Sequence, residues 1–376
     1  MDQATTQPTI IQRLAEILGG ASLTTGAAMD ADQLVQMAMD EGVVALLHAR
    51  LHAAGPAAMV PAALRERLGH AAQVEAARSL YLENRCRQIL ACLAGAQLPV
   101  LLLKGSALAY WAYAAPHLRK CADIDLLLRS RAEVEQALSL LAELGYQARE
   151  RALPGDLVSF EVTCVPAASA PFPLEIDLHW RLSSSPMSAF RFDWDELFAQ
   201  AIALPALAPN ARALAPIHAY LHACMHRMQN RSNGVADRLK WLYDLDLLGR
   251  GFSASDWDRL TTLAIERGLA GVCRDGALAS AARFGDVMPA SVLARLAGAA
   301  PGEALDVTRL DRWWYVQRMS LSVWPTLRLK VRWLRQRLVP DRAYLRERYG
   351  AGASLPTALL SRLRAAFNRV LARGRR

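Results

Sequence analysis

Aspartates separated by a single residue are the first candidates for chemistry in this chain. Only Asp123 and Asp125 lie in a run predicted to be a strand, "DIDLLL", where a period of two projects both carboxylates to one face. In helices, positions i and i+2 point apart. Two carboxylates on one rigid surface suit Mg²⁺, which takes one or two of them plus water and substrate phosphates. The five pairs of this spacing are Asp30/Asp32, Asp123/Asp125, Asp193/Asp195, Asp244/Asp246 and Asp256/Asp258.

A second predicted strand supplies a third carboxylate. In "PLEIDLHW" the same alternation places Glu175, Asp177 and His179 on one face. If the two strands are neighbours, Asp177 joins Asp123 and Asp125, and two metal ions can be held close together. Carboxylates gathered in this way repel one another, so they require a cation between them. Glu175 and His179 are candidates for supporting the metal ligands, with ordinary structural roles as the alternative.

A glycine–serine turn precedes the acidic pair. Gly105 and Ser106 follow the predicted strand "PVLLL" and open the helix-like run "SALAYWAYA". Backbone N–H groups at a helix start hold anions, and glycine lets a phosphate approach, although serine is also an ordinary helix cap. Lys104, Arg119 and Lys120 add positive charge. The turn and the carboxylates together predict a nucleoside triphosphate held through its phosphates and magnesium.

Two later segments predicted to be helical carry further candidates. In "RLKWLYDLDLL", Lys240 and Asp244 are four residues apart, so a salt pair along the helix is the default and a cleft-facing role the alternative. His218, His222 and His226 share one face of "PIHAYLHACMHRMQN". Packing between helices and a face lining the cleft both stay open for these histidines, with His222 a candidate supporting residue. A zinc site would need a fourth ligand.

The elements that must position these residues divide the chain into four predicted regions. Residues 1–93 predict helices, and residues 94–190 predict an α/β core of short apolar strands with a hairpin loop at 165–173. Residues 191–308 predict helices that complete the cleft, and residues 309–376 a basic helical region. The expected fold class is α+β, a small mixed sheet flanked by N-terminal and C-terminal helical regions.

The net charge of +9 is unevenly distributed. Residues 309–376 contain 17 Arg and Lys against 3 acids, whereas the remainder contains 27 basic and 32 acidic residues. The positive charge therefore belongs to the tail, which does not favour a nucleic-acid footprint over the whole protein. In "TLRLKVRWLRQRL", Leu327, Val331, Leu334 and Leu338 lie along one side; docking on the protein's own body is the default, and an anionic membrane surface or acidic partner the alternative.

The chain contains no apolar run long enough to cross a bilayer, and its first residues, "MDQATTQPTI", are polar. We therefore expect a cytoplasmic protein. Its hydrophobic content of 53% is enough for substantial cores.

The runs "LLLKGSALA", "LRKCADIDLLL", "EIDLHW" and "RLKWLYDLDLL" closely resemble the bacterial uncharacterised nucleotidyltransferases of the polymerase-β-like superfamily. The resemblance covers residues 98–248 and implies a palm-like core. It implies that Gly105 and Ser106 form the phosphate-binding turn, that Asp123 and Asp125 bind metal, and that Asp177 is the third carboxylate. A lysine precedes the glycine here, where many members have a second glycine or a phenylalanine.

The expected activity is transfer of a nucleoside monophosphate from an NTP such as ATP to an acceptor, with release of pyrophosphate. Two Mg²⁺ ions are expected, with Mn²⁺ as an alternative: one held by Asp123 and Asp125, the other shared with Asp177 and acting on an acceptor hydroxyl. The resemblance suggests a peptide natural product, a phosphopeptide or a sugar phosphate as acceptor. The alternatives are a nucleotide-binding partner protein without catalysis, and an enzyme that modifies nucleic acid through the basic tail.

Overall fold

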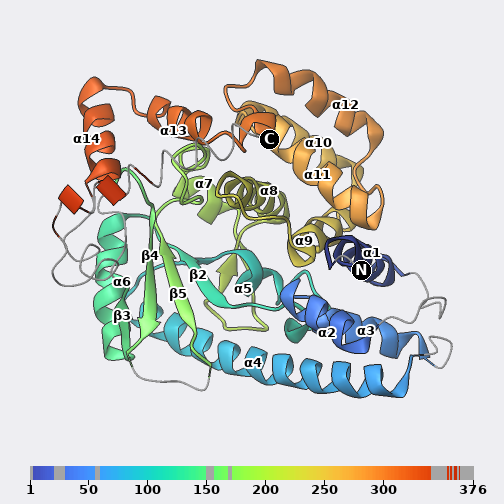
Figure 1. The fold of residues 1–376 in the computed structure, drawn as a ribbon. Helices are drawn as coiled ribbons and strands as arrows, with labels where there is room; N and C mark the ends of the chain where they lie inside the picture. The colour runs from blue at the N-terminus through green and yellow to red at the C-terminus, as the bar shows by residue number, and fades with distance from the viewer. Residues whose placement is uncertain are drawn as a thin grey trace.

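The computed structural model describes residues 3–20, 30–55, 60–149, 156–167 and 172–339, and a few positions between 354 and 364. Its described strands form a seven-stranded mixed sheet in the order β3-β4-β5-β2-β1-β7-β6, with helices on both faces (Figure 1). The predicted α+β class with a small mixed sheet is therefore confirmed. The strands are β1 (Leu101–Leu102), β2 (Asp123–Leu127), β3 (Tyr146–Ala148), β4 (Glu161–Pro166), β5 (Glu175–His179), β6 (Ile202–Ala203) and β7 (Arg212–Ala213).

The centre of the sheet is the parallel pair β2 and β5. Strand β4 joins β5 antiparallel as the predicted hairpin, and β1 joins β2 antiparallel on the other side. Strands β6 and β7 lie beyond residue 190 and extend the same sheet, because β7 pairs with β1. The division of the chain into four regions stays a prediction.

One face of the sheet is apolar and covered by two helices. Ile124 and Leu126 of β2 and Ile176 and Leu178 of β5 are buried in one hydrophobic cluster. Helix α4 (Ala62–Gly95) contributes its C-terminal half to this cluster, and α6 (Arg131–Glu143) contributes Val134, Ala137 and Leu141. Helix α6 begins at Ser130, whose side chain caps it by accepting a hydrogen bond from the Glu133 N–H.

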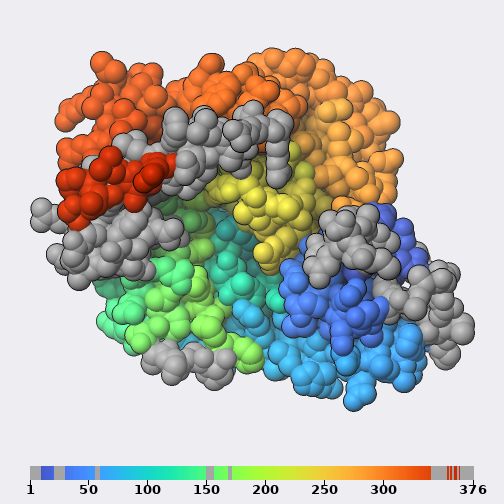
Figure 2. Space-filling model, in the orientation of Figure 1, coloured from blue at the N-terminus to red at the C-terminus, as the bar shows by residue number. Residues whose placement is uncertain are grey.

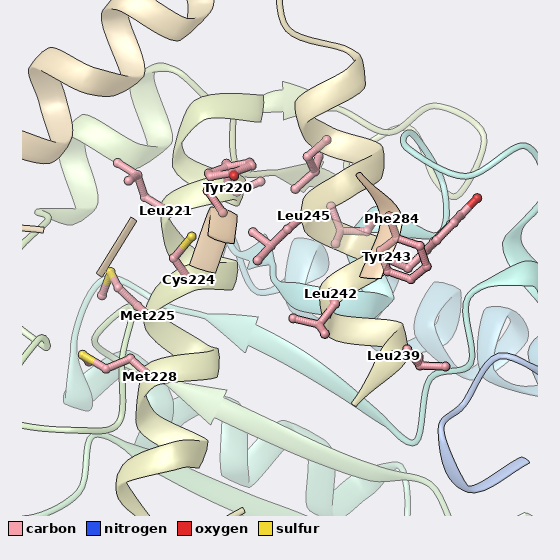
Figure 3. Packing of buried hydrophobic residues seen from close by; sticks show 14 of the residues in the cluster. Tyr220, Leu221, Cys224, Met225, Met228, Leu239, Leu242, Tyr243, Leu245 and Phe284 are labelled. Atoms are coloured by element: carbon pink, nitrogen blue, oxygen red, sulfur yellow. The ribbon is translucent and has the colours of Figure 1, made fainter. Parts of the chain in front are cut away.

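The opposite side of the sheet faces a larger helical layer. Helices α8 and α9 pack closely through apolar side chains, and Phe284 of α11 packs edge-on against Tyr243 of α9 (Figure 3). Helices α1 to α3 contribute to the same core from the N-terminal end. The bounds are α1 (Gln3–Leu18), α2 (Ala31–Asp40), α3 (Val44–Ala53), α5 (Lys104–Leu108), η2 (Pro116–Leu118), α7 (Trp194–Ala199), α8 (Pro216–Ser232), α9 (Leu239–Arg250), α10 (Ala254–Glu266), α11 (Ala270–Phe284), α12 (Ala290–Ala299), η3 (Ala300–Gly302) and η4 (Val307–Arg309).

The C-terminal helices α13 (Trp313–Ser322) and α14 (Leu327–Leu338) form a third, small cluster with the loop before β4. Trp324 and Trp333 pack there against Phe160. The side of α14 that carries Leu327 and Val331 is exposed, so the expectation that this side docks on the protein's own body is wrong. Trp333 docks instead. Within the described residues, no helix combines the length and the apolar character that a membrane crossing requires.

A buried ion pair connects the sheet to the helical layer. Arg119, just ahead of β2, donates to both carboxylate oxygens of Asp244 on α9, at 2.8 and 2.7 Å. The hydroxyl of Tyr113 donates to the same carboxylate at 2.7 Å. Both charged side chains are almost fully buried. Removing one partner would leave the other charge buried without compensation, which is the costly case for an ion pair.

We expect Asp244→Ala to lower the free energy of unfolding by about 3–5 kcal/mol, because Arg119 is then left unpaired in the interior. The matched control is Asp258→Ala, which removes an exposed pair with Arg295 and should cost less than about 1 kcal/mol. Urea unfolding followed by circular dichroism measures both. Equal losses for the two variants would show that the Arg119–Asp244 pair does not hold the layers together.

Candidate active site

A row of polar side chains follows one face of the three strands β2, β5 and β4. In the parallel pair, Asp125 lies opposite Asp177, and in the antiparallel pair Asp177 lies opposite Thr163. Successive side chains alternate between the faces of a sheet, so the polar residues share the face opposite the apolar cluster. The two acidic strands are therefore paired, as is required if Asp177 is to lie beside Asp125.

Asp125 is the centre of this row. It is 1% exposed, and its Oδ1 accepts a hydrogen bond from the Lys104 ammonium at 2.6 Å. The same oxygen lies 3.0 Å from Nε2 of His179, which donates when that nitrogen carries the proton. Burial alone would raise the pKa of Asp125, but the nearby Lys104 and His179 hold it below its usual value. Asp125 is therefore ionised at neutral pH.

The pKa values of the other two aspartates, Asp123 and Asp177, are raised. Repulsion by Asp125, reinforced by burial, raises the pKa of Asp123 to about 6. Burial, and then the charge of Asp125, raise the pKa of Asp177. Asp177 also accepts a hydrogen bond from the Thr163 hydroxyl. Two carboxyl groups held against their own repulsion favour a bound cation.

One group of ligand atoms has spacing suited to a metal ion. Single atoms of Asp125, Asp177 and His179 all lie within 4.8 Å of one another. Asp123 is outside this group, although it lies on the same strand face. Glu175 is farther out, at the start of β5, where it forms an ion pair with Arg149.

The predicted phosphate turn lies directly after β1, at the start of the short helix α5. Lys104 has a φ of +51°, in the left-handed region that few residues adopt, and its side chain points to Asp125. Gly105 is closely packed: a Cβ there would lie 3.0 Å from the Arg119 guanidinium and 3.0 Å from the Cys121 sulfur, so these side chains would have to move slightly. The buried Ser106 hydroxyl donates to the Leu103 carbonyl at 2.8 Å. The turn is thus locked to β2.

The remaining predicted cations differ in their partners. Arg119 is paired with Asp244, so the expected salt pair between Lys240 and Asp244 is not formed. The ammonium of Lys120 lies 3.2 Å from Glu75 and donates to the Met39 carbonyl at 3.2 Å. Both of these cations are used mainly to hold elements together.

Lys240 differs from Arg119 and Lys120 because its ammonium has no carboxylate partner within ion-pair distance among the described residues. Burial, and then the charge of Arg119, lower its pKa to about 8. Its aliphatic chain crosses Gly42, whose φ of +73° and absent side chain permit the contact; a Cβ there would come within 2.7 Å of the Lys240 Cδ. A half-buried cation of this kind is suited to an anionic ligand.

The histidines of α8 have three different environments. His218 lies 3.5 Å from Glu196, away from the acidic strands. His222 is buried beside the site, and burial together with the Lys104 charge lowers its pKa to about 3, so it is neutral. His226 bonds Asn230 at 2.9 Å and packs edge-on against Trp241. His222 and His226 face the cleft, whereas His218 does not.

Many of the predicted site residues line one cleft that is partly open to solvent. In Figure 2 the surface around β1 and β2 is recessed between the N-terminal helices, α9 and the strands β4 and β5. Asp123, Asp125, Lys104 and Lys240 line the cleft, and the indole rings of Trp111 and Trp241 supply apolar wall. Other predicted site residues in the lining are Gly105, Arg119, Lys120, Asp244 and His222, whereas Asp177 lies beside the cleft, paired with Asp125 across the two strands.

Sequence reasoning missed two residues of strand β4. Glu161 lies 3.4 Å from Nδ1 of His179, and Thr163 bonds Asp177. The alternation in "FEVTCV" and the predicted hairpin contain the necessary signal, because the hairpin register sets these side chains beside those of β5. No local sequence pattern indicates that Trp111 and Trp241 line the cleft.

Comparisons with known proteins identify the family of this chain. Residues 27–305 match the family described as uncharacterised nucleotidyltransferase. A search of curated proteins gives no match. A solved structure of MenT4, a nucleotidyltransferase toxin from Mycobacterium tuberculosis, is similar with a TM-score of 0.33 and 12% identity over 89% of this chain and 99% of that one. So distant a likeness says nothing of substrate or role. The family match spans most of the sequence, and the chain belongs to this nucleotidyltransferase family.

Proposed function

We propose that this nucleotidyltransferase uses Mg²⁺ to transfer a nucleoside monophosphate from an NTP to a small acceptor, releasing pyrophosphate. The acceptor classes are a peptide natural product, a phosphopeptide and a sugar phosphate. The observation that carries the proposal is the meeting of Asp125 and Asp177 across two parallel strands, beside a cleft lined by Lys104 and Lys240. Acidic and basic groups together match a metal–triphosphate ligand.

The residues present fit a magnesium site. Carboxylate oxygens are the ligands that Mg²⁺ prefers. The pKa of Asp123 is raised chiefly by the neighbouring Asp125, and that of Asp177 by burial and then by Asp125, so a cation bound here would stabilise both carboxylates. Asp125 and Asp177 would hold the metal, with Asp123, which lines the cleft on the same strand face, as a further carboxylate. His179 and Thr163 would orient Asp125 and Asp177. Bound there, Mg²⁺ supplies charge neutralisation of the phosphates and activation of the acceptor oxygen.

Lys104 has a double role in this proposal. In the absence of ligand its ammonium neutralises Asp125. A triphosphate offers it a second anion, so Lys104 and Gly105 would contact phosphate at the turn when the metal takes over the carboxylate. Lys240 approaches the same cleft from α9 and would contact phosphate from the opposite wall. The rings of Trp111 and Trp241 offer an apolar surface for the nucleobase.

The proposal is tested by incubating the protein with each NTP, Mg²⁺ and panels of the three acceptor classes, with RNA as a further arm. Mass spectrometry detects an added nucleoside monophosphate, and a coupled assay detects pyrophosphate. Nucleotide binding with neither product would instead favour the non-catalytic partner protein. Transfer to RNA alone would favour the nucleic-acid enzyme.

Asp177→Asn should reduce nucleotidyl transfer by about 100-fold or more, because it removes a charge that acts on the developing transition state. It should also weaken Mn²⁺ binding, measured by electron paramagnetic resonance, while leaving the circular dichroism spectrum unchanged. Asp195→Asn is the matched control, since Asp195 belongs to another Asp-x-Asp pair and its side chain is 86% exposed. Full activity in Asp177→Asn would remove the third carboxylate from the scheme.

Lys104→Met should tighten the binding of Mn²⁺ in the absence of nucleotide, because no ammonium then competes with the metal for Asp125. We expect the dissociation constant to fall about tenfold, a free-energy change of the size of one pKa unit. The same variant should bind NTP more weakly. Lys120→Met is the control, because Lys120 pairs with Glu75 instead. Isothermal titration calorimetry measures both ligands, and unchanged or weaker Mn²⁺ binding in Lys104→Met would contradict competition.

The affinity for metal-free NTP should fall as the pH rises through about 8, where Lys240 loses its proton and its attraction for phosphate. Below that pH the ammonium is charged and binding is at its strongest. Lys240→Arg should remove this pH dependence, because a guanidinium stays protonated. Fluorescence titration with a labelled NTP between pH 6.5 and 9 separates the cases; identical pH profiles for both proteins would show that Lys240 does not contact the nucleotide.

A further inference from the structure

The exposed side of α14 is a continuous apolar stripe. Leu327 is 77% exposed, Val331 58%, Leu334 46% and Leu338 44%. Successive helix residues turn by about 100°, so these four side chains lie within an arc of roughly 60°. Large apolar side chains exposed singly are ordinary, but four in line on one helix form a surface.

Cations border this stripe on both sides. On the same helical projection, Arg328, Arg332 and Arg335 follow one edge of the stripe, and Lys330 and Arg337 follow the other. The helix contains five basic residues and no acidic one. A narrow apolar stripe between two basic margins is the pattern of a helix that lies in the plane of a lipid interface.

The opposite side of α14 anchors the helix to the protein. Trp333 is 4% exposed and packs in the small cluster with Phe160 and Trp324. Gln336 donates to Asp156 at 3.1 Å and accepts from the Leu157 N–H at 3.1 Å. The stripe therefore faces outward on a fixed helix, at an extremity of the molecule (Figure 1).

We propose that α14 is a docking surface for an anionic lipid membrane. Leu327, Val331, Leu334 and Leu338 insert among the acyl chains near the headgroups. Arg328 and Arg335 contact lipid phosphates, whereas Arg332 is held by Asp156. This contact goes beyond nucleotidyl transfer, because the cleft is built from other elements. None of the described helices can cross a membrane, so this contact would attach the enzyme to the surface of the bilayer.

The positive charge beside the stripe favours an anionic lipid over the two alternatives within this protein, a second copy of the chain and the residues after 339. A second copy of this chain would set one basic margin against another, and the residues after 339 are themselves basic, with nine arginines against two acids. Both contacts suffer like-charge repulsion. The stripe is also convex, so a protein partner would need a matching groove, whereas a bilayer interface accepts a convex helix without one.

The full-length protein is mixed with vesicles of phosphatidylcholine alone or with a quarter of phosphatidylglycerol, and bound protein is measured by sedimentation. We expect binding to the anionic vesicles only, weakened by salt because the basic margins are screened. The variant Leu327→Gln/Val331→Gln/Leu334→Gln keeps every charge and should bind at least tenfold more weakly. Its three positions are exposed, so its melting temperature should match the parent's.

The matched control is Val74→Gln/Leu80→Gln/Leu278→Gln, which changes three apolar side chains that are exposed on other helices. It should bind like the parent. Arg328→Gln/Arg335→Gln should weaken binding and its salt dependence, while Arg65→Gln/Arg274→Gln should not. Equal binding by the parent and the stripe variant would overturn the proposal, as would binding to neither vesicle. Self-association abolished by the stripe variant, seen by light scattering without vesicle binding, would assign the stripe to a second copy.

Discussion

Repulsion between carboxylates on neighbouring strands is the constraint on which the site depends. The parallel pairing of β2 and β5 sets Asp125 against Asp177 whatever their charges, because backbone hydrogen bonds and the apolar cluster on the reverse face hold the strands in register. Lys104 and His179 balance the charge of Asp125, whereas burial and the charge of Asp125 raise the pKa values of Asp123 and Asp177. Such a face is suited to a divalent cation.

The cations around the cleft have different partners, and only some of them are held in ion pairs within the protein. Arg119 and Asp244 neutralise each other inside the wall and hold α9 against the sheet. This pairing frees Lys240 from its neighbour four residues along the helix, so its ammonium is left to face the cleft at a lowered pKa. Lys104 belongs to both groups, because it neutralises Asp125 while it lines the same cleft. Positive charge here is therefore placed by specific contacts, whereas on α14 it points outward.

Much of the acidic site was predictable because its signals are local. Alternation in "DIDLLL" and "EIDLHW" assigns each side chain to a face, and a face once assigned holds for the whole strand. The hairpin of β4 and β5 follows from a short loop between two strand-like runs. Strands β6 and β7 were missed, since two residues carry too little pattern to identify a strand. The exposed stripe of α14 was also assigned wrongly, because amphipathicity indicates two faces without saying which one is covered.

The sequence by itself determined the fold class, the acidic residues and the faces of the strands that carry them. Only the tertiary structure decided the partners: Arg119 with Asp244, 125 residues away, and Lys104 and His179 with Asp125. The physical reason is range. Periodicity and turn preferences act over a few residues, whereas an ion pair forms between whichever charges the packed layers bring together, and the sequence offers forty-four basic and thirty-five acidic residues to choose from.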